Sequence, residues 1–169
     1  MPFTPFHLGP SLLFGLVFSS IFDLATFLIA SVIPDIEPFC IILFNLSGIL
    51  HGFFHSYVGA SILAVSVAVV VYLLGDILAK IVQKFRISQK SSFQKILFTS
   101  FVGTYSHVFL DSFLYSEMDP FYPLQGNPFV GVISEYLTFM SVYGFCGLSL
   151  ILGIILYFYK IRKGTAVLG

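Results

Sequence analysis

The sequence predicts an all-α membrane protein, a bundle of transmembrane helices forming one integral membrane domain over residues 1–169. Composition is the first observation: 57% of the residues are hydrophobic and 9% are charged, whereas soluble domains carry about 25% charged residues. A soluble chain of this length could not bury so much apolar surface. The second observation is that the basic residues fall in two separate blocks, with long apolar segments beside them.

The eight basic residues lie in two blocks that set the predicted orientation. Five lie in the 80–95 segment with no acid among them, three close the chain after residue 159, and residues 1–79 contain none. Because basic loops favour the cytoplasm, we predict that 80–95 is a cytoplasmic loop of a multi-pass cell-membrane protein and that the C-terminus is also cytoplasmic. The formal net charge of zero gives no argument for binding a polyanion, and because predicted membrane spans flank the basic loop on both sides, we expect no nucleic-acid partner.

Three apolar segments predict full spans, over residues 57–79, 96–115 and 136–159. Crossing about 30 Å of hydrocarbon takes roughly 20 helical residues. With 80–95 in the cytoplasm, the first span enters from outside, the second exits and the third returns. Segment 116–129 is then an outer loop, and it is expected to be irregular because of Pro120, Pro123, Gly126 and Pro128.

The first third of the chain is less regular. Asp23 interrupts the apolar stretch over residues 8–33 and is a good N-cap for a helix that begins at Leu24, and Pro34 ends that helix. Two helices of about 14 and 10 residues would be roughly 21 and 15 Å long, too short to span. This pattern favours a re-entrant hairpin packed inside protein; one continuous fourth span is the alternative.

Four ionisable residues form two pairs with helical i, i+4 spacing. His51 and His55 lie in HGFFHS, just before the 57–79 span, and His107 and Asp111 lie in SHVFLD, near the end of the 96–115 span. Residues four apart share one helix face, which suits two ligands of one metal or of adjacent metals. The predicted topology places both pairs at the outer membrane boundary.

The same outer layer is predicted to hold further nitrogen and oxygen donors: His7, Asp35, Glu37 and Asp119. Imidazole and carboxylate ligands without thiolate suit zinc or manganese, so we expect a divalent metal, one or two ions of zinc with manganese as the alternative. Cys40 and Cys146 show no metal-ligand spacing and are interpreted as small buried hydrophobic residues.

The motifs PFTPFH, PDIE, HGFFHS, SHVFLD and DPFYP occur in this order over about residues 1–125. In this respect the chain resembles the YdjM-like family of membrane-bound metal-dependent hydrolases. The resemblance implies these site residues: His7, Asp35, Glu37, His51, His55, Ser56, His107, Asp111 and Asp119. The chain departs from the family pattern in two places, since Glu37 replaces an aspartate and Gly52-Phe53 replaces an Arg-Gly pair. The ligand order is also loosely similar to that of zinc-dependent phospholipase C and related nucleases, which implies phosphoester chemistry.

These observations lead to one main hypothesis, a metal-dependent hydrolase at the outer membrane face. Asp35 and Asp119 are the predicted catalytic carboxylates, and the predicted metal ligands are His7, Asp35, Glu37, His51, His55, His107 and Asp111. A bound metal would activate water for hydrolysis. A site at headgroup level fits an amphiphilic small molecule, such as a lipid or isoprenoid phosphoester. The expected partners are therefore this substrate and the bilayer. Ser56 is interpreted as the N-cap of the 57–79 helix.

Two other function classes stay open from the sequence. Histidines on adjacent helices could ligate haem, although the neighbouring carboxylates disfavour an apolar haem pocket. A small transporter or channel could line a path with Asp23, Asp76 and the two i, i+4 pairs.

Overall fold

The computed structural model describes residues 5–87, 89–132 and 134–163, which form helices and connecting segments without a β-strand. The helices are α1 (Leu8–Val17), α2 (Leu24–Ala30), α3 (Ile36–Leu43), α4 (Tyr57–Leu73), α5 (Gly75–Gln83), α6 (Phe93–Ser112) and α7 (Glu135–Arg162). Three short 3-10 turns accompany them: η1 (Pro5–His7), η2 (Ile33–Asp35) and η3 (Phe53–His55). The prediction of an all-α fold is confirmed for the described residues.

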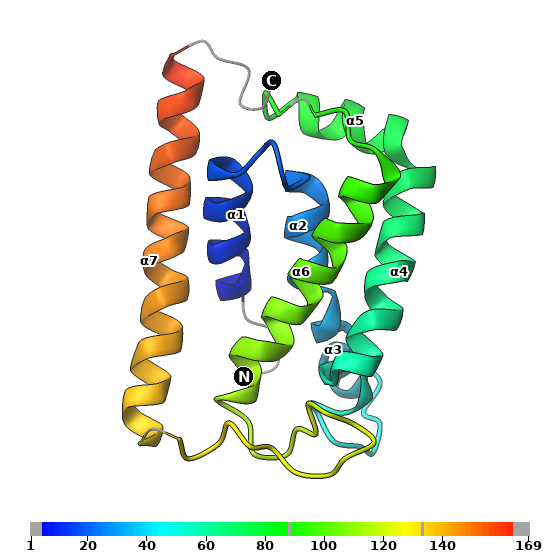
Figure 1. Ribbon diagram of the computed structural model, residues 1–169, viewed down its shortest axis with the longest axis vertical. Helices are drawn as coiled ribbons and strands as arrows, with labels where there is room; N and C mark the ends of the chain where they lie inside the picture. The colour runs from blue at the N-terminus through cyan, green and yellow to red at the C-terminus, as the bar shows by residue number, and fades with distance from the viewer. Residues whose placement is uncertain (1–4, 88, 133, 164–169) are drawn as a thin grey trace.

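The helices form two packed pairs with α2 between them (Figure 1). Helix α1 packs along α7 and α4 packs along α6, while α2 contacts α1, α4 and α6. Small residues allow this close packing. A Cβ atom on Gly103 would lie 2.6 Å from the Cβ of Ala30, and one on Gly9 would overlap the carbonyl oxygen of Cys146. Cys146 is buried, as predicted, whereas Cys40 is only half-buried.

The N-terminal segment folds as two short helices side by side, not as one continuous span. Helix α1 ends at Val17, the chain reverses, and α2 begins after Asp23, whose side chain accepts a hydrogen bond from the Thr26 N–H at 2.9 Å. The predicted N-cap is therefore confirmed, and the alternative of an unbroken fourth span is wrong. The physical reason is that the Asp23 carboxylate satisfies the first free N–H groups of a new helix.

Helical structure continues beyond Pro34, where the sequence indicated an end. Helix α2 does stop before this proline, but Pro34 lies in η2 and α3 follows directly. Proline is tolerated in the first turn of a helix, where its missing N–H is not needed. The combined segment Leu24–Leu43 has 20 residues and is long and apolar enough to cross a membrane.

The predicted span 57–79 is broken near its end. Helix α4 ends at Leu73 and α5 runs at 78° to it. Helix α5 carries Asp76 and Lys80, and continuing it into hydrocarbon would bury these charges at a high cost. It lies across one end of the bundle instead (Figure 1). The connection to α6 covers only residues 84–92, so the loop predicted over 80–95 is shorter than expected.

Of the other two predicted spans, 136–159 has the length and apolarity of a membrane helix, whereas 96–115 does not meet both criteria. Helix α7, Glu135–Arg162, meets both and contains the predicted 136–159 span. Helix α6 has 20 residues, yet it is not among the candidate spans because one of its faces is polar and buried. Three full spans are therefore not established: the described residues contain two candidate spans, or three if α4 and α5 count as one.

Both basic blocks lie at the same end of the bundle, here called the basic end, formed by α5, the start of α6 and the end of α7 (Figure 1). One lysine from each basic block caps the C-terminal end of α1. Lys95 Nζ donates to the Ser19 carbonyl at 2.7 Å, and Lys160 Nζ donates to the Leu16 carbonyl at 2.8 Å. Cations stabilise the free carbonyl groups at a helix C-terminus. The opposite end, here called the metal end, holds η2, η3 and the end of α6.

Candidate metal centre

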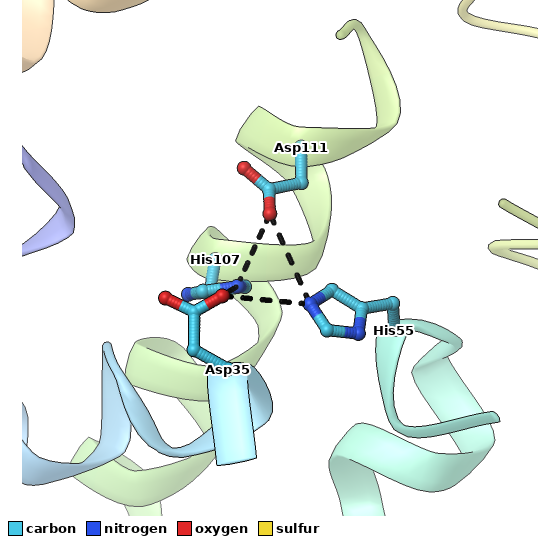
Figure 2. Close-up of side chains that lie close together, drawn as sticks. All are labelled: Asp35, His55, His107 and Asp111. Atoms are coloured by element: carbon cyan, nitrogen blue, oxygen red, sulfur yellow. Dashed lines mark ion pairs between the residues drawn. The ribbon is translucent and has the colours of Figure 1, made fainter. Parts of the chain in front are cut away.

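Four buried side chains from three separate segments converge at the metal end (Figure 2). Asp35 comes from η2, His55 from η3, and His107 and Asp111 from α6. Each offers one ligand atom, and these four atoms all lie within 4.8 Å of one another. The two α6 residues are one helical turn apart, as the i, i+4 spacing predicted.

The distances between these atoms suit a small divalent ion. Asp111 Oδ2 lies 3.2 Å from His107 Nε2 and 3.9 Å from His55 Nε2. Asp35 Oδ1 lies 3.6 Å from His107 Nε2 and 3.8 Å from His55 Nε2. In a tetrahedral site with ligands about 2.0–2.1 Å from zinc, neighbouring ligand atoms lie about 3.3 Å apart. These four distances lie within about 0.6 Å of that value, and since all four donor atoms lie within 4.8 Å of one another, a modest contraction toward a common centre would complete the site.

Unsatisfied atoms mark the same centre. His55 Nε2, His107 Nε2 and Asp35 Oδ2 are buried and have no hydrogen-bond partner within the described residues. A buried polar atom without a partner costs about 1–3 kcal/mol, so such atoms are rare in folded proteins. A divalent cation would satisfy the two imidazole nitrogens at once. The donor set and its geometry thus fit a metal.

In both His107 and His55, the ring nitrogen that points away from the centre, Nδ1, donates a hydrogen bond that fixes the orientation of the ring. His107 Nδ1 donates to the Ser31 carbonyl at 2.7 Å, and His55 Nδ1 donates to Glu37 Oε2 at 3.1 Å. Because each acceptor requires a proton on Nδ1, Nε2 is the nitrogen that faces the centre in both rings and is available to a metal once it is deprotonated. Such outer partners orient metal-binding histidines and raise their basicity. Glu37, a predicted ligand, therefore lies behind His55 in this structure and not among the four converging groups.

Glu37 also organises the segment that delivers His55. The same Oε2 atom accepts hydrogen bonds from the backbone N–H groups of Gly52 and Phe54, both at 3.1 Å. Ser56 then caps α4, because its Oγ accepts from the Gly59 N–H at 3.0 Å. The predicted N-cap role of Ser56 is confirmed.

Electrostatics at this centre favour bound positive charge. Burial lowers the pKa of His55, but its contacts with Asp35 and Glu37, and the nearby Asp111, raise it more strongly, to about 9. A group of carboxylates that holds a proton this firmly also attracts a divalent cation, which would replace that proton.

His7 lies beside the four-residue group. Its Nε2 is 3.0 Å from Asp111 Oδ1, and its ring stacks on His107 with 4.0 Å between ring centroids. Its Nδ1 is buried without a hydrogen-bond partner. The contact with Asp111 places His7 behind a candidate ligand, where it orients the carboxylate.

His51 is separated from the centre by its own partners. Its Nδ1 lies 2.9 Å from Glu117 Oε1, and its ring stacks on Tyr115 with centroids 3.7 Å apart. Burial lowers the pKa of His51 by more than the contact with Glu117 raises it. The pKa of Glu117 is also lowered, because the hydrogen bond from His51 outweighs the effect of partial burial. Sequence reasoning did not identify Glu117, although the acid lies two residues before Asp119.

Asp119 lies in the loop between α6 and α7, outside the four-residue group. Its Oδ1 accepts a hydrogen bond from the Gly126 N–H at 2.6 Å, which closes a turn of that loop. In this structure Asp119 holds the loop in place.

Taken together, the apolar helices and the buried histidine–aspartate centre define a helical membrane protein with a candidate metal site inside the bundle. The chain belongs to the YdjM inner membrane protein family, whose family model matches residues 4–168. The match extends the resemblance seen over residues 1–125 to the described part of α7. Comparisons with curated proteins and with solved structures give no match.

Proposed function

We propose that this protein is a divalent-metal-dependent hydrolase that acts on an amphiphilic phosphoester at a membrane surface. One observation carries the proposal: two imidazoles with their Nδ1 atoms fixed by acceptors point their free Nε2 atoms at two buried carboxylates. This donor set, with nitrogen and oxygen ligands and no thiolate, favours zinc, with manganese as the alternative.

Each residue of the centre has a distinct chemical task in this proposal. A bound divalent ion supplies Lewis acidity and lowers the pKa of water. His55, His107, Asp111 and Asp35 would hold the ion. The second oxygen, Asp35 Oδ2, has no hydrogen-bond partner in the described structure and is free to accept a proton from the attacking water. His7 and Glu37 keep Asp111 and His55 in position.

The substrate class follows from the position of the centre and its charge. The site lies at one end of apolar helices, where lipid headgroups are found, and residues 1–79 contain no lysine or arginine to bind an anion. The phosphate charge would therefore be neutralised by the metal and by backbone N–H groups. The positive-inside rule places the basic end in the cytoplasm and the metal end outside.

Elemental analysis and hydrolysis together test the proposal. The purified protein is expected to hold divalent metal, to lose it with hydrolysis on chelation, and to recover both when zinc is returned. Hydrolysis is followed with a chromogenic phosphodiester and with phospholipid vesicles. Metal retained by a folded H107A/D111A double variant would overturn the metal site. Metal binding without hydrolysis of either substrate, together with ion flux in proteoliposomes, would favour transport instead.

A further inference from the structure

The four histidines of the chain lie in one row of neighbouring rings that passes through the candidate metal centre. The ring centroids of His51 and His55 are 4.9 Å apart, and those of His55 and His107 are 5.3 Å apart. His7 stacks on His107, with 4.0 Å between the centroids. We call these four rings the histidine row. His55 and His107 are candidate ligands and His7 contacts one, whereas His51 has no place in the centre itself.

The metal centre within this row is closed to solvent. The side chains of its four residues are at most 3% exposed. An ion that binds there must therefore pass neighbouring side chains on its way in, and it loses water as it does so. Carboxylate and imidazole groups along the way reduce the cost of taking a charge out of water, because they replace the lost water ligands.

Glu117 is the point at which the histidine row meets solvent. Its side chain is 41% exposed, whereas the other three carboxylates that contact a histidine in the described part of the chain are at most 16% exposed. Glu117 Oε1 lies 2.9 Å from His51 Nδ1, and the Tyr115 ring stacks on His51 with centroids 3.7 Å apart. Glu117 and His51 therefore connect solvent to His55.

The two atoms of this pair are ligand types that zinc and manganese accept. A neutral imidazole can carry its proton on either nitrogen, so His51 with its proton on Nε2 offers Nδ1 to an ion. Zinc sites that retain their ion have three or four protein ligands, and this pair supplies two. The pair thus suits an ion in passage and not a resident one.

The charge of this end of the molecule favours the arrival of cations. All eight lysines and arginines belong to the two blocks at the basic end (Figure 1). None of them repels a cation that approaches the metal end, where Glu117 is exposed. A region with one sign of charge raises the local concentration of counter-ions and their rate of association.

We propose that Glu117 and His51 form a loading site, through which a divalent cation reaches the metal centre. The ion binds first between Glu117 Oε1 and His51 Nδ1 and then passes along the histidine row to His55 and the other ligands. This inference rests on the metal centre of the proposed function but not on hydrolysis. The loading site sets how fast the ion enters and leaves, whereas the four ligands set the affinity.

Rapid mixing of the metal-free, full-length protein with cobalt(II) in detergent tests the loading site. The visible absorption of cobalt changes when it is coordinated, and excess chelator added afterwards measures release. Glu117→Gln keeps the size of the side chain and removes its charge. We expect association to slow at least about tenfold and release to slow by the same factor, since one route serves both directions. The equilibrium affinity should change by less than about fivefold.

Glu135→Gln is the matched control, because it removes the same charge at the exposed start of α7, at the same end of the bundle. This variant should bind and release cobalt as the parent does. Equal slowing in both variants would assign the effect to general attraction of cations and overturn the loading site. Faster association and release in Glu117→Gln would make the pair a barrier, and unchanged rates would give it no role; either result overturns the inference.

His51→Gln is a second variant, and it should slow both rates in the same way. A fall in equilibrium affinity of more than about a hundredfold would make His51 a resident ligand and overturn the loading site. Slower loading in both variants of the pair, with no hydrolysis by the parent, would leave the loading site and overturn the hydrolase. A parent protein that binds neither cobalt nor zinc would overturn the metal centre and the loading site together.

Discussion

Two buried aspartate clusters, one toward each end of the bundle, differ in how completely their oxygens are hydrogen-bonded. Toward the basic end, Asp23 Oδ1 accepts from the Thr26 N–H at 2.9 Å and from the Thr26 hydroxyl at 2.6 Å. Asp23 Oδ2 accepts from the Ser91 hydroxyl at 2.8 Å. At the metal end, Asp35 Oδ2 and three imidazole nitrogens, those of His7, His55 and His107, have no such partner within the described residues.

This contrast separates a structural carboxylate from a candidate ligand. A satisfied buried carboxylate stabilises the local fold, here the start of α2, and needs no further binding partner. Buried polar groups without a hydrogen-bond partner reduce stability unless a bound ligand satisfies them. Such groups are typical of functional sites. Both clusters contain aspartate in an apolar bundle, so residue type alone does not distinguish them.

The largest effect is expected from removing a ligand at the metal end. Asp111→Ala deletes the carboxylate that lies near both imidazole Nε2 atoms, and metal affinity should fall by well over about a hundredfold, beyond the effect of an outer partner. Elemental analysis after dialysis measures this loss. Asp76→Ala, on the exposed side of α5, is the control and should retain the metal. Metal content unchanged in Asp111→Ala would place the ion elsewhere.

A smaller loss is expected when the partner behind His55 loses its charge. Glu37→Gln keeps the size of the side chain but weakens the hold on His55 Nδ1, and metal affinity should fall about tenfold to a hundredfold. Competition with a zinc-binding dye measures the affinity. Glu135→Gln at the exposed start of α7 is the matched control. A loss as complete as that of Asp111→Ala would make Glu37 a direct ligand, as the sequence predicted.

The pH dependence of metal binding should follow the proton on His55. Its pKa is raised to about 9 without metal, so the ring is protonated at neutral pH and must release a proton to bind an ion. Affinity should therefore rise about tenfold for each pH unit from about 6.5 to 9, with roughly one proton released per ion. Calorimetry in buffers of different ionisation enthalpy measures this release. A flat profile over this range would exclude His55 as a ligand.

The stability of the metal-free protein should fall as the pH rises, whereas its metal affinity rises. The folded pKa of His55 lies above its unfolded value of about 6.5, so the contribution of its contacts is complete below that pH. This contribution is lost as the pH rises through about 9. Chelated protein should thus melt at a lower temperature in alkaline buffer, and saturating metal should reduce the difference.

The smallest effect is expected at the satisfied cluster. Asp23→Ala removes the N-cap of α2 and should lower the free energy of unfolding by about 1 kcal/mol, with the metal content unchanged. Asp23→Asn retains a capping side chain and should restore most of the stability. Thermal melting in detergent and elemental analysis of the same samples measure both quantities. Loss of metal in a folded Asp23→Ala variant would remove the distinction between the two clusters.

Local chemistry made several elements predictable from the sequence. Asp23 and Ser56 cap helices as expected, because a short polar side chain before an apolar run satisfies free backbone N–H groups. The pair His107 and Asp111 shares a face because the helix repeat fixes it. The bend after Leu73 was not predicted, although Gly75 and Asp76 interrupt the apolar run there, because these two residues do not by themselves set the direction in which the helix continues.

The site was only partly predictable, because local sequence signals do not show which helices pack together. All four members of the centre were among the predicted ligands. The other three predicted ligands lie outside it: His7 contacts Asp111, Glu37 lies behind His55, and His51 lies against Glu117. The Ser31 carbonyl that orients His107 leaves no trace in the sequence, because every residue has a carbonyl group. Which donors converge depends on how η2, η3 and α6 pack, and residue spacing does not record this.

By itself, the sequence determined that the chain is helical and apolar, that its basic blocks are separated from its histidines, and which residue types could hold a metal. These properties follow from composition and from interactions within a few residues of the chain. The tertiary structure decided which donors meet and which carboxylate is already satisfied. Residues as far apart as His7 and Asp111, which are 104 positions apart in the chain, form these contacts, and only the packing of the helices brings them within hydrogen-bonding distance.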